Sequence, residues 1–332
     1  MHTPWREFAL WIPREAVAKT ESRPMLLGFG LPQCGQLAHP DALTTIARQL
    51  ESIGYHSLWT FERLLYPVNP RTPYPASADG RLPELTKALL HPLDALTFVA
   101  PLTERIRLGT SVLNMPFYNP VMLARRLTSL DVLSRGRLTV GLGLGWSQDE
   151  FEAAGAPLAE RGARADEFLD LLRTLWGPSP ASFEGRYYRL APSVFELRPV
   201  QQPHPPLLLA AYTPGSMARV ASKADGWNPA GLPLSALKAM WAGIQQQATQ
   251  AGRDSAQLQL VGRANLMLLP QPLPDEGRFP FVGSLDQIIE DIRAHREAGV
   301  QELILDAQFS PGMQDSTSLL DTAAALWQAA SH

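Results

Sequence analysis

Short apolar runs alternate with stretches of helical periodicity along most of the chain. Residues 25–31 are apolar throughout, which is typical of a buried strand, and residues 41–53 place apolar side chains on one helix face before Gly54. The same pairing recurs towards the C-terminus. Further strands are predicted at 57–60, 105–113, 138–143, 207–211, 226–228, 258–268 and 302–306. The helices predicted to follow them cover 91–100, 121–133, 163–176, 217–224, 234–250, 285–298 and 319–330.

Eight strand and helix repeats predict a (β/α)8 TIM barrel, because parallel strands need crossover helices and eight such strands close into a ring. A doubly wound open sheet is the alternative, since periodicity does not reveal strand order. We expect residues 25–332 to form one domain and residues 1–24 an N-terminal extension. Two loop insertions are predicted to form walls or lids over a pocket: 64–90 after strand two, and 183–206 after strand four with an extra hairpin.

Composition and charge exclude several partners. The 332 residues are 45% hydrophobic and 18% charged, which leaves enough apolar material for a large buried core. The net charge of −3 provides no excess of basic groups for nucleic acid or for an anionic membrane. No apolar run reaches the roughly 18 residues that span a bilayer, and no signal peptide is recognisable. We therefore expect a cytoplasmic protein that binds neither nucleic acid nor membrane.

Residue types that bind metals are sparse. Cys34 is the only cysteine, which excludes an intrachain disulfide and a thiolate zinc site and fits a reducing compartment. The seven histidines are scattered along the chain without the spacing of metal ligands. The sequence therefore predicts no metal site.

In a barrel the residues just beyond the strands face the active site. Here these positions are aromatic, rich in glycine and poor in acids. No pair of carboxylates recurs at the strand ends as a glycosidase would need, although Glu62 with Asp306 is a candidate pair. Residues 141–146, Gly-Leu-Gly-Leu-Gly-Trp, lack the last glycine of a dinucleotide motif, and no strong helix is predicted directly after them. Their glycines allow a flat ring to approach the backbone, and tight barrel packing is the other explanation.

A helix start follows the strand predicted at 207–211. Thr213 or Ser216 can cap this helix, and Pro214 suits its first turn. The free N–H groups and the helix dipole at such an end form a site for a phosphate. Capping alone also explains these residues, because every helix needs a cap.

Several segments taken together resemble the bacterial luciferase-like superfamily of flavin-dependent monooxygenases and F420-dependent oxidoreductases. The similar segments are GFGLP at 28–32, GYHSLW at 54–59, RIRLGTSV at 105–112, LSRGR at 133–137, GLGLGW at 141–146 and ADGW at 224–227. The resemblance implies a TIM barrel that binds a reduced flavin or deazaflavin at the C-terminal ends of its strands. It also favours a homodimer, as do the apolar faces of the predicted helices 91–100 and 121–133.

The resemblance also implies cofactor contacts by position. The candidate cofactor-binding residues are Gly30, Ser111, Val112, Asn114, Gly143, Gly145, Trp146, Tyr212, Gly215, Ser216 and Met217. Family members often have a non-proline cis peptide behind the flavin ring, and the matching bond here is Ser111-Val112. Gly215 and Ser216 match the positions that would meet the cofactor phosphate.

One position departs from the family pattern. Many F420-dependent relatives have an Asp-His pair after the second strand, whereas this chain has Glu62 and Arg63 there. These two are the candidate catalytic residues: Glu62 is the titratable group that remains, and Arg63 could hold an anionic substrate or the cofactor. A salt bridge is the other explanation for Glu62.

Three functions are consistent with the resemblance. The first is hydride transfer between coenzyme F420 and a small organic substrate. The second is an FMN-dependent monooxygenase that takes reduced FMN from a partner reductase and uses O₂, and the third is a protein that binds a flavin without turnover. The polyanionic tail of F420 favours the first, because several arginines lie in or near the loops that could receive it. These arginines are Arg63, Arg71, Arg125, Arg126, Arg161 and Arg164.

Overall fold

The predicted strands form one parallel sheet that closes on itself in the computed structural model, which describes residues 24–75, 77, 79–313 and 315–330. The strands of the barrel are β1 (Leu26–Gly30), β2 (Ser57–Thr60), β3 (Arg107–Thr110), β4 (Leu113–Asn114), β5 (Leu138–Gly143), β8 (Leu207–Leu209), β9 (Gly226–Trp227), β10 (Gln259–Asn265) and β13 (Glu302–Asp306). The remaining strands are β6 (Ala181–Glu184), β7 (Arg189–Ser193), β11 (Met267–Leu268) and β12 (Val282–Gly283).

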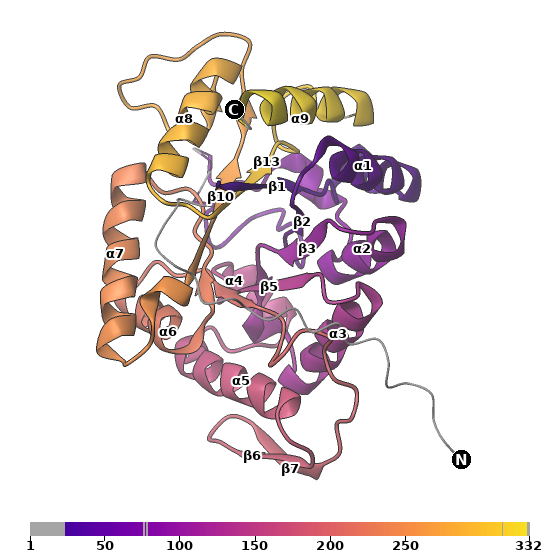
Figure 1. The fold of residues 1–332 in the computed structure, drawn as a ribbon, viewed down its shortest axis with the longest axis vertical. Helices are drawn as coiled ribbons and strands as arrows, with labels where there is room; N and C mark the ends of the chain where they lie inside the picture. The colour runs from indigo at the N-terminus through magenta and orange to yellow at the C-terminus, as the bar shows by residue number, and fades with distance from the viewer. Residues whose placement is uncertain (1–23, 76, 78, 314, 331–332) are drawn as a thin grey trace.

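Strand order confirms the eight-stranded barrel and excludes the open sheet. The order is β3, β2, β1, β13, β10, β9, β8 and β5, and β5 pairs again with β3 to close the ring (Figure 1). The strand predicted at 258–268 is divided between β10 and β11, and β11 pairs with β12 outside the ring.

The third strand of the barrel is interrupted between β3 and β4. Both segments pair with β5, Gly109 of β3 with Thr139 and Leu113 of β4 with Leu142. Between these two pairs the third strand advances by four residues, whereas β5 advances by three. The additional residue makes a bulge. The Ser111-Val112 bond, which lies in this bulge, is cis as predicted.

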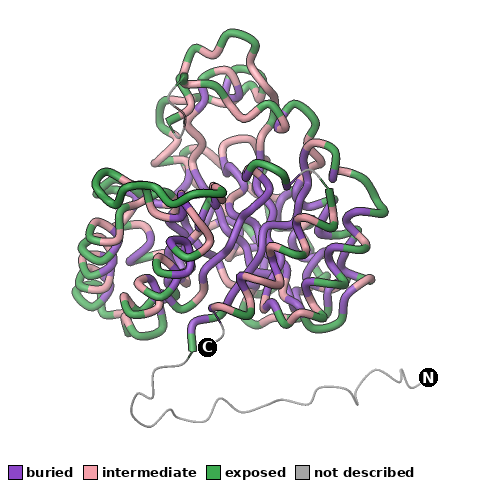
Figure 2. The backbone as a smooth tube through the Cα atoms, turned by 90° about the horizontal axis from the view of Figure 1, so that it is seen from above, coloured by how far each residue is buried: buried purple, intermediate pink, exposed green. Residues whose placement is uncertain are grey.

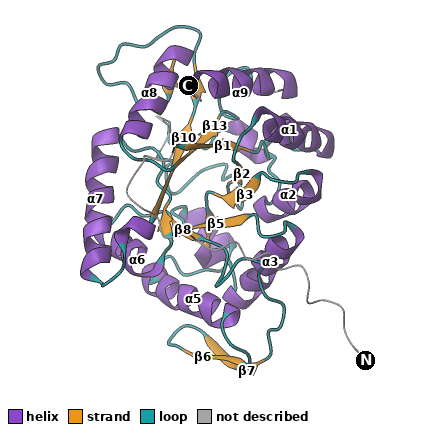
Figure 3. Cartoon of the chain, viewed as in Figure 1, coloured by secondary structure: helices purple, strands orange, loops and turns teal. Residues whose placement is uncertain are grey.

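Helices other than the short α4, which lies at the mouth, cover the outside of the barrel (Figure 3). The α-helices in the described residues are α1 (Pro40–Ile53), α2 (Pro92–Val99), α3 (Pro120–Leu133), α4 (Gln148–Ala153), α5 (Arg161–Trp176), α6 (Pro214–Lys223), α7 (Leu234–Gln250), α8 (Leu285–Glu297) and α9 (Ser316–Ala330). Proline occupies the first turn of α1, α2, α3 and α6, where its missing N–H removes no helical hydrogen bond. Helix α3 also has the Asn119 cap, whose Oδ1 accepts the N–H of Val121 at 3.0 Å.

The strands at the centre of the molecule consist mostly of buried residues, and exposed residues lie mainly on the surrounding segments (Figure 2). Trp59 packs with Leu208, Val261 and Ile304, which come from three other strands of the ring. A Cβ atom on Gly109 would lie 2.4 Å from the Trp59 ring. Glycine is therefore required beside this indole, because any side chain there would clash with it.

One insertion differs from its predicted place. Residues 61–91 connect β2 to α2, but the second insertion follows α5 rather than the fourth strand itself. Its hairpin, β6 and β7, packs against α5 on the outside of the molecule (Figure 1). The placement directly after strand four was wrong, because this segment is a connection from a helix to a strand.

A short helix, α4, begins just after Trp146, where the sequence predicted no strong helix. Ser147 caps it, since its Oγ accepts the N–H of Glu150 at 3.4 Å. Acidic residues in its first turn suit the positive end of a helix. These local effects, rather than apolar periodicity, account for the helix that the prediction missed.

No helix in the described part of the chain is long and apolar enough to cross a membrane. Residues 1–23 of the predicted N-terminal extension lie outside the described residues. The boundary between this extension and the barrel therefore stays a prediction.

Large apolar side chains remain exposed on α2 and α3. Phe98 is 40% exposed, Met122 68% and Leu133 60%. Such side chains favour burial against another chain, so the homodimer stays our prediction. We expect light scattering to give the mass of two chains for the wild type and of one chain for Met122→Glu.

The control for this experiment is Phe279→Glu, which places the same charge on an exposed residue before β12 and is expected to leave the dimer intact. A wild-type protein that is monomeric at micromolar concentration contradicts the dimer.

Candidate functional site

Glu62 lies just beyond β2, and its side chain is buried with 7% exposure. One carboxylate oxygen accepts the backbone N–H of Asn114 at 2.7 Å, and the other accepts the hydroxyl of Tyr118. Burial raises the pKa of Glu62 to about 7, although these hydrogen bonds act in the opposite direction and the nearby Glu150 adds to the rise. Glu62 is therefore a group that exchanges a proton near neutral pH.

Arg63 points to a different partner. Its Nη1 donates to the buried carboxylate of Glu150 at 3.2 Å, which also accepts the N–H of Leu64 at 2.7 Å. The guanidinium lies over the rings of Trp146, at 4.8 Å, and Tyr74, at 5.6 Å. Its positive charge is therefore matched within the protein, and Trp146 contributes to holding it.

A buried ion pair that the sequence reasoning missed joins the neighbouring strands β10 and β13 at the barrel mouth. Arg263 of β10 donates to the carboxylate of Asp306 at the end of β13 and to the carbonyl oxygen of Ser111. Its guanidinium lies 5.2 Å from the centre of the Phe61 ring. The signal in the sequence was a single charged residue inside the apolar stretch 258–268.

Asp306 has further neighbours besides Arg263. The Nε2 of Gln308 donates to its Oδ1 at 2.8 Å, and a Cβ atom on Gly30 would lie 2.6 Å from that same oxygen. Gly30, predicted to contact the cofactor, thus makes room for Asp306. Asp306 forms an ion pair with Arg263, whereas Glu62 accepts hydrogen bonds from neutral donors. The two carboxyls that were predicted as a candidate pair therefore have separate partners.

Packing, one of the two explanations left open, accounts for Gly141 and Gly143 in β5. A Cβ on Gly141 would lie 2.0 Å from the carbonyl oxygen of Thr110, and one on Gly143 would lie 2.6 Å from the side chain of Val112. Gly145 has φ +68° and lies beside the Asn114 side chain, 3.5 Å from where its Cβ would be. These residues bring β5 close to the bulge.

The start of α6 has the capping box that its sequence suggested. The Oγ of Thr213 accepts the N–H of Ser216 at 3.4 Å, and the Oγ of Ser216 accepts the N–H of Thr213 at 3.0 Å and of Tyr212 at 3.1 Å. A Cβ on Gly215 would meet no atom within 4 Å, so the backbone here faces open space.

A cleft of about 280 Å³ lies at this helix start. Its lining residues are Leu144, Leu158, Ala159, Glu160, Arg161, Gly162, Thr213, Gly215, Ser216 and Arg219. Arg219 is bound to Asp166, whereas the Nη1 of Arg161 donates only to the carbonyl of Leu158, at 2.9 Å, among the described residues. The cleft thus joins a helix N-terminus to a guanidinium without an acidic partner in the described chain, a combination that suits a phosphate.

The other two predicted contacts lie nearby. The hydroxyl of Tyr212, a residue that is 49% exposed, accepts the N–H of Ala230 at 2.9 Å. The terminal methyl of Met217 lies 3.8 Å from where a Cβ on Gly243 of α7 would be. Met217 therefore packs between helices, whereas Tyr212 stands at the surface of the barrel mouth.

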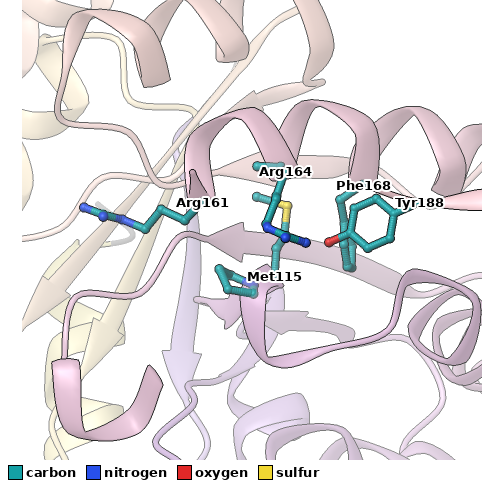
Figure 4. A pocket seen from close by; sticks show the side chains of 7 residues that line it. Met115, Arg161, Arg164, Phe168 and Tyr188 are labelled. Carbon is teal, nitrogen blue, oxygen red and sulfur yellow. The ribbon is translucent and has the colours of Figure 1, made fainter. Parts of the chain in front are cut away.

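A second, much smaller cavity lies behind α5. It measures about 10 Å³, room for about one water molecule and too little for a cofactor ring. Figure 4 shows Arg164 and Tyr188 facing each other across it beside Phe168, with Arg161 extending away from them. This orientation leaves Arg161, and not Arg164, available to the cleft at α6.

The other arginines predicted to receive an anion have partners. Arg71 is bound to Asp149 and Glu152, and Arg126 is bound to Asp94. Arg125 lies over the ring of Phe195 at 5.0 Å. Within the described residues, no group of three or more His, Cys, Asp or Glu side chains is arranged to hold a metal ion.

Comparison with models of known protein families identifies the family of this chain. The model of the luciferase-like monooxygenase family matches residues 20–272. The chain belongs to this family. Its members are flavin- or F420-dependent oxidoreductases, and the cofactor they use is F420 or FMN.

Individual proteins are also similar to this luciferase-like protein. An uncharacterized protein of Mycobacterium tuberculosis is 34% identical over 69% of this chain and 79% of its own. An F420-dependent glucose-6-phosphate dehydrogenase of Kineococcus radiotolerans is 32% identical over 63% of this chain and 57% of its own. The monooxygenase RslO1 from Streptomyces bottropensis has the same fold, with a TM-score of 0.72 at 22% identity over 90% of this chain and 98% of its own.

The Arg263 and Asp306 pair yields a prediction about stability. Arg263→Met leaves the Asp306 carboxylate buried without its counter-ion, and we expect a loss of about 3 to 5 kcal/mol in the free energy of unfolding. The double variant Arg263→Met/Asp306→Asn should lose less, because the amide carries no charge. Urea unfolding measures both.

Arg189→Met is the control, since it breaks an ion pair whose side chains are 78% and 81% exposed, and its stability should stay close to wild type. Equal losses in the single and double variants contradict the role given to the Asp306 charge.

The cleft at α6 yields a prediction about cofactor binding. Gly215→Asp places a carboxylate against the expected phosphate and should weaken the binding of F420 or FMN at least tenfold, or about 1.4 kcal/mol. Gly215→Asn has the same shape without the charge and is the matched control. Titration calorimetry of the folded variants measures the affinity, and an unchanged value for Gly215→Asp removes the phosphate site.

Proposed function

We propose that this protein is an F420-dependent oxidoreductase that moves a hydride between the deazaflavin and a carbonyl or alcohol of a small organic substrate. The observation that carries the proposal is the buried carboxyl of Glu62 just beyond β2. Transfer of a hydride to a carbonyl carbon leaves charge on the oxygen, so the reaction needs a proton donor. Glu62 supplies that proton. It lies at the strand end where many F420-dependent relatives have an Asp-His pair, which this chain lacks.

The partners of Glu62 support this role. Tyr118 and Asn114 donate to its two oxygens, and no basic side chain in the described residues forms an ion pair with it. Because its pKa is raised to about 7, the acid and the carboxylate are both populated at neutral pH. A group in that state can donate a proton in one direction of the reaction and accept it in the other.

The cleft at α6 supports the choice of cofactor. F420 carries a phosphate and a tail of further anionic groups, and Arg161 with the start of α6 provides positive charge for them. The name of the Kineococcus radiotolerans relative also favours F420. FMN carries one phosphate and could enter the same cleft, so the test compares the two cofactors.

Residues at the barrel mouth have different roles in the proposed reaction. When bound, reduced F420 supplies the hydride. Glu62 in its acid form gives its proton to the substrate oxygen, while Tyr118 and Asn114 stabilise the carboxylate that results. Arg263 donates to the Ser111 carbonyl across the mouth, and Asp306 balances the charge of Arg263.

Binding and turnover together test the proposal. We expect fluorescence titration to give tighter binding of F420 than of FMN, and F420 reduction on addition of one member of a panel of alcohols. Glu62→Gln should keep the affinity and lose at least about a hundredfold in kcat. Tighter binding of FMN with O₂ consumption indicates the monooxygenase instead, and saturable binding without turnover indicates a flavin-binding protein.

The raised pKa of Glu62 also predicts how stability changes with pH. The folded protein keeps the Glu62 proton up to about pH 7, whereas the unfolded chain releases it near the ordinary value of 4.5. The folded state therefore loses stability as the pH rises through this window. Glu62→Gln has no such loss, so its stability relative to wild type should rise by up to about 3 kcal/mol across the window.

Urea unfolding at several pH values between 4 and 8 measures this change. Glu184→Gln replaces an exposed glutamate and is the control, for which the two pH curves should run in parallel. Parallel curves for Glu62→Gln and wild type contradict the raised pKa.

A further inference from the structure

A row of hydrogen bonds leads from Glu62 to the surface of the barrel. The Tyr118 hydroxyl contacts the Glu62 carboxylate on one side and lies 3.1 Å from Nε2 of His91 on the other. The Nδ1 of His91 lies 3.4 Å from a guanidinium nitrogen of Arg126 and 3.7 Å from a carboxylate oxygen of Asp94. His91 is 35% exposed, so this row ends in solvent.

The donors in this row have one consistent direction. Arg126 can only donate, so His91 accepts at Nδ1 and carries its hydrogen at Nε2. Nε2–H then donates to the oxygen of Tyr118, whose own hydrogen points to Glu62. Each hydrogen thus points to the next acceptor on the way from the surface to Glu62. Three polar side chains that merely packed together would not need to point their hydrogens in one common direction.

We propose that Tyr118 and His91 form a proton relay that connects solvent to Glu62. The inference rests on the proposed function in one respect, which is that Glu62 loses a proton to the substrate when a carbonyl is reduced. The relay then restores that proton without opening the barrel mouth to water. Tyr118 and His91 act through Glu62 and are positioning residues in the reaction.

One proton moves inward at each link of the relay, and the transfers occur together, so that Tyr118 and His91 are neutral before and after them. The O–H bond of Tyr118 breaks as its proton passes to the Glu62 carboxylate, and the Tyr118 oxygen takes the Nε2 proton of His91. On the side that faces Asp94, the Nδ1 of His91 takes a proton from an acid of the solvent, hydronium or a protonated buffer, whose conjugate base stays in solution. Exchange with water then returns the imidazole to its first tautomer. Burial and the neighbouring Glu62 raise the pKa of Tyr118, so its hydroxyl carries the proton without becoming a stable anion.

The charged groups around the relay come from several elements. Glu150 of α4 faces Glu62, and Arg63 binds that carboxylate from the other side. Asp94 of α2 and Arg126 of α3 face His91 and bind each other. Burial and Arg126 lower the pKa of His91, while Asp94 acts in the opposite direction, so the neutral imidazole that the relay needs is favoured at neutral pH.

The rate at which Glu62 takes up a proton tests the relay without cofactor or substrate. Light releases protons from a caged acid in the intact protein, and the infrared band of the protonated Glu62 carboxyl is followed in time. Glu62→Gln identifies that band, because the variant lacks it. We expect His91→Ala to slow proton uptake at least tenfold and added imidazole to restore it, since His91 is exposed and its side chain caps no helix.

Tyr118→Phe removes the middle of the relay and should slow uptake at least tenfold, with no rescue by imidazole. Tyr66→Phe is the matched control, because it removes an exposed hydroxyl that donates to Glu84 at 2.8 Å, and its rate should equal wild type. Wild-type rates in His91→Ala overturn the relay, and so does a slow His91→Ala that imidazole does not restore.

The relay and the proposed function can fail separately. Slow, rescuable uptake in His91→Ala together with no F420 turnover in the wild type supports the relay and refutes the proposed reaction. Unchanged uptake together with F420 turnover that depends on Glu62 overturns the relay and leaves the reaction standing.

Discussion

The indole of Trp59 constrains how the whole barrel packs. Its Nε1 donates to Ser57 at 2.6 Å and to Glu302 at 3.0 Å, which ties the ring to the base of the barrel. A Cβ atom on Gly28 would lie 2.7 Å from Nε1, and one on Gly109 would lie 2.4 Å from the ring. Because this one side chain takes so much of the interior, the neighbouring strands carry glycine, and the polar groups of the mouth lie beyond a packed floor.

Carboxylates buried at the mouth differ in what they contact, and this difference decides their chemistry. Glu150 binds Arg63 and Asp306 binds Arg263, so each carries its charge beside a guanidinium. Glu62 accepts hydrogen bonds from neutral groups alone among the described residues. Burial without a counter-ion favours the protonated acid, which is the physical reason that Glu62 is the group suited to exchange a proton.

The cleft proposed for the cofactor phosphate and the proposed proton relay lie on different sides of the barrel. The cleft for an anionic group lies between α5 and α6, whereas the row from Glu62 through Tyr118 to His91 reaches the surface near α2 and α3, on another side of the ring (Figure 1). A cofactor bound in that cleft would leave the path to His91 open. The proton and the cofactor therefore need not compete for one entrance.

The sequence determined the features that depend on neighbours along the chain. Apolar periodicity and crossover helices predicted the barrel, and residues 213–216 predicted the cap of α6, because caps and helix faces involve residues a few positions apart. Tertiary structure decided the partners. Arg263 meets the Ser111 carbonyl across 152 positions and Tyr118 meets Glu62 across 56, and no local pattern encodes which distant side chain fills a shared interior. Only closure of the ring brings these groups within hydrogen-bonding distance, because it places strands far apart in sequence around one small volume.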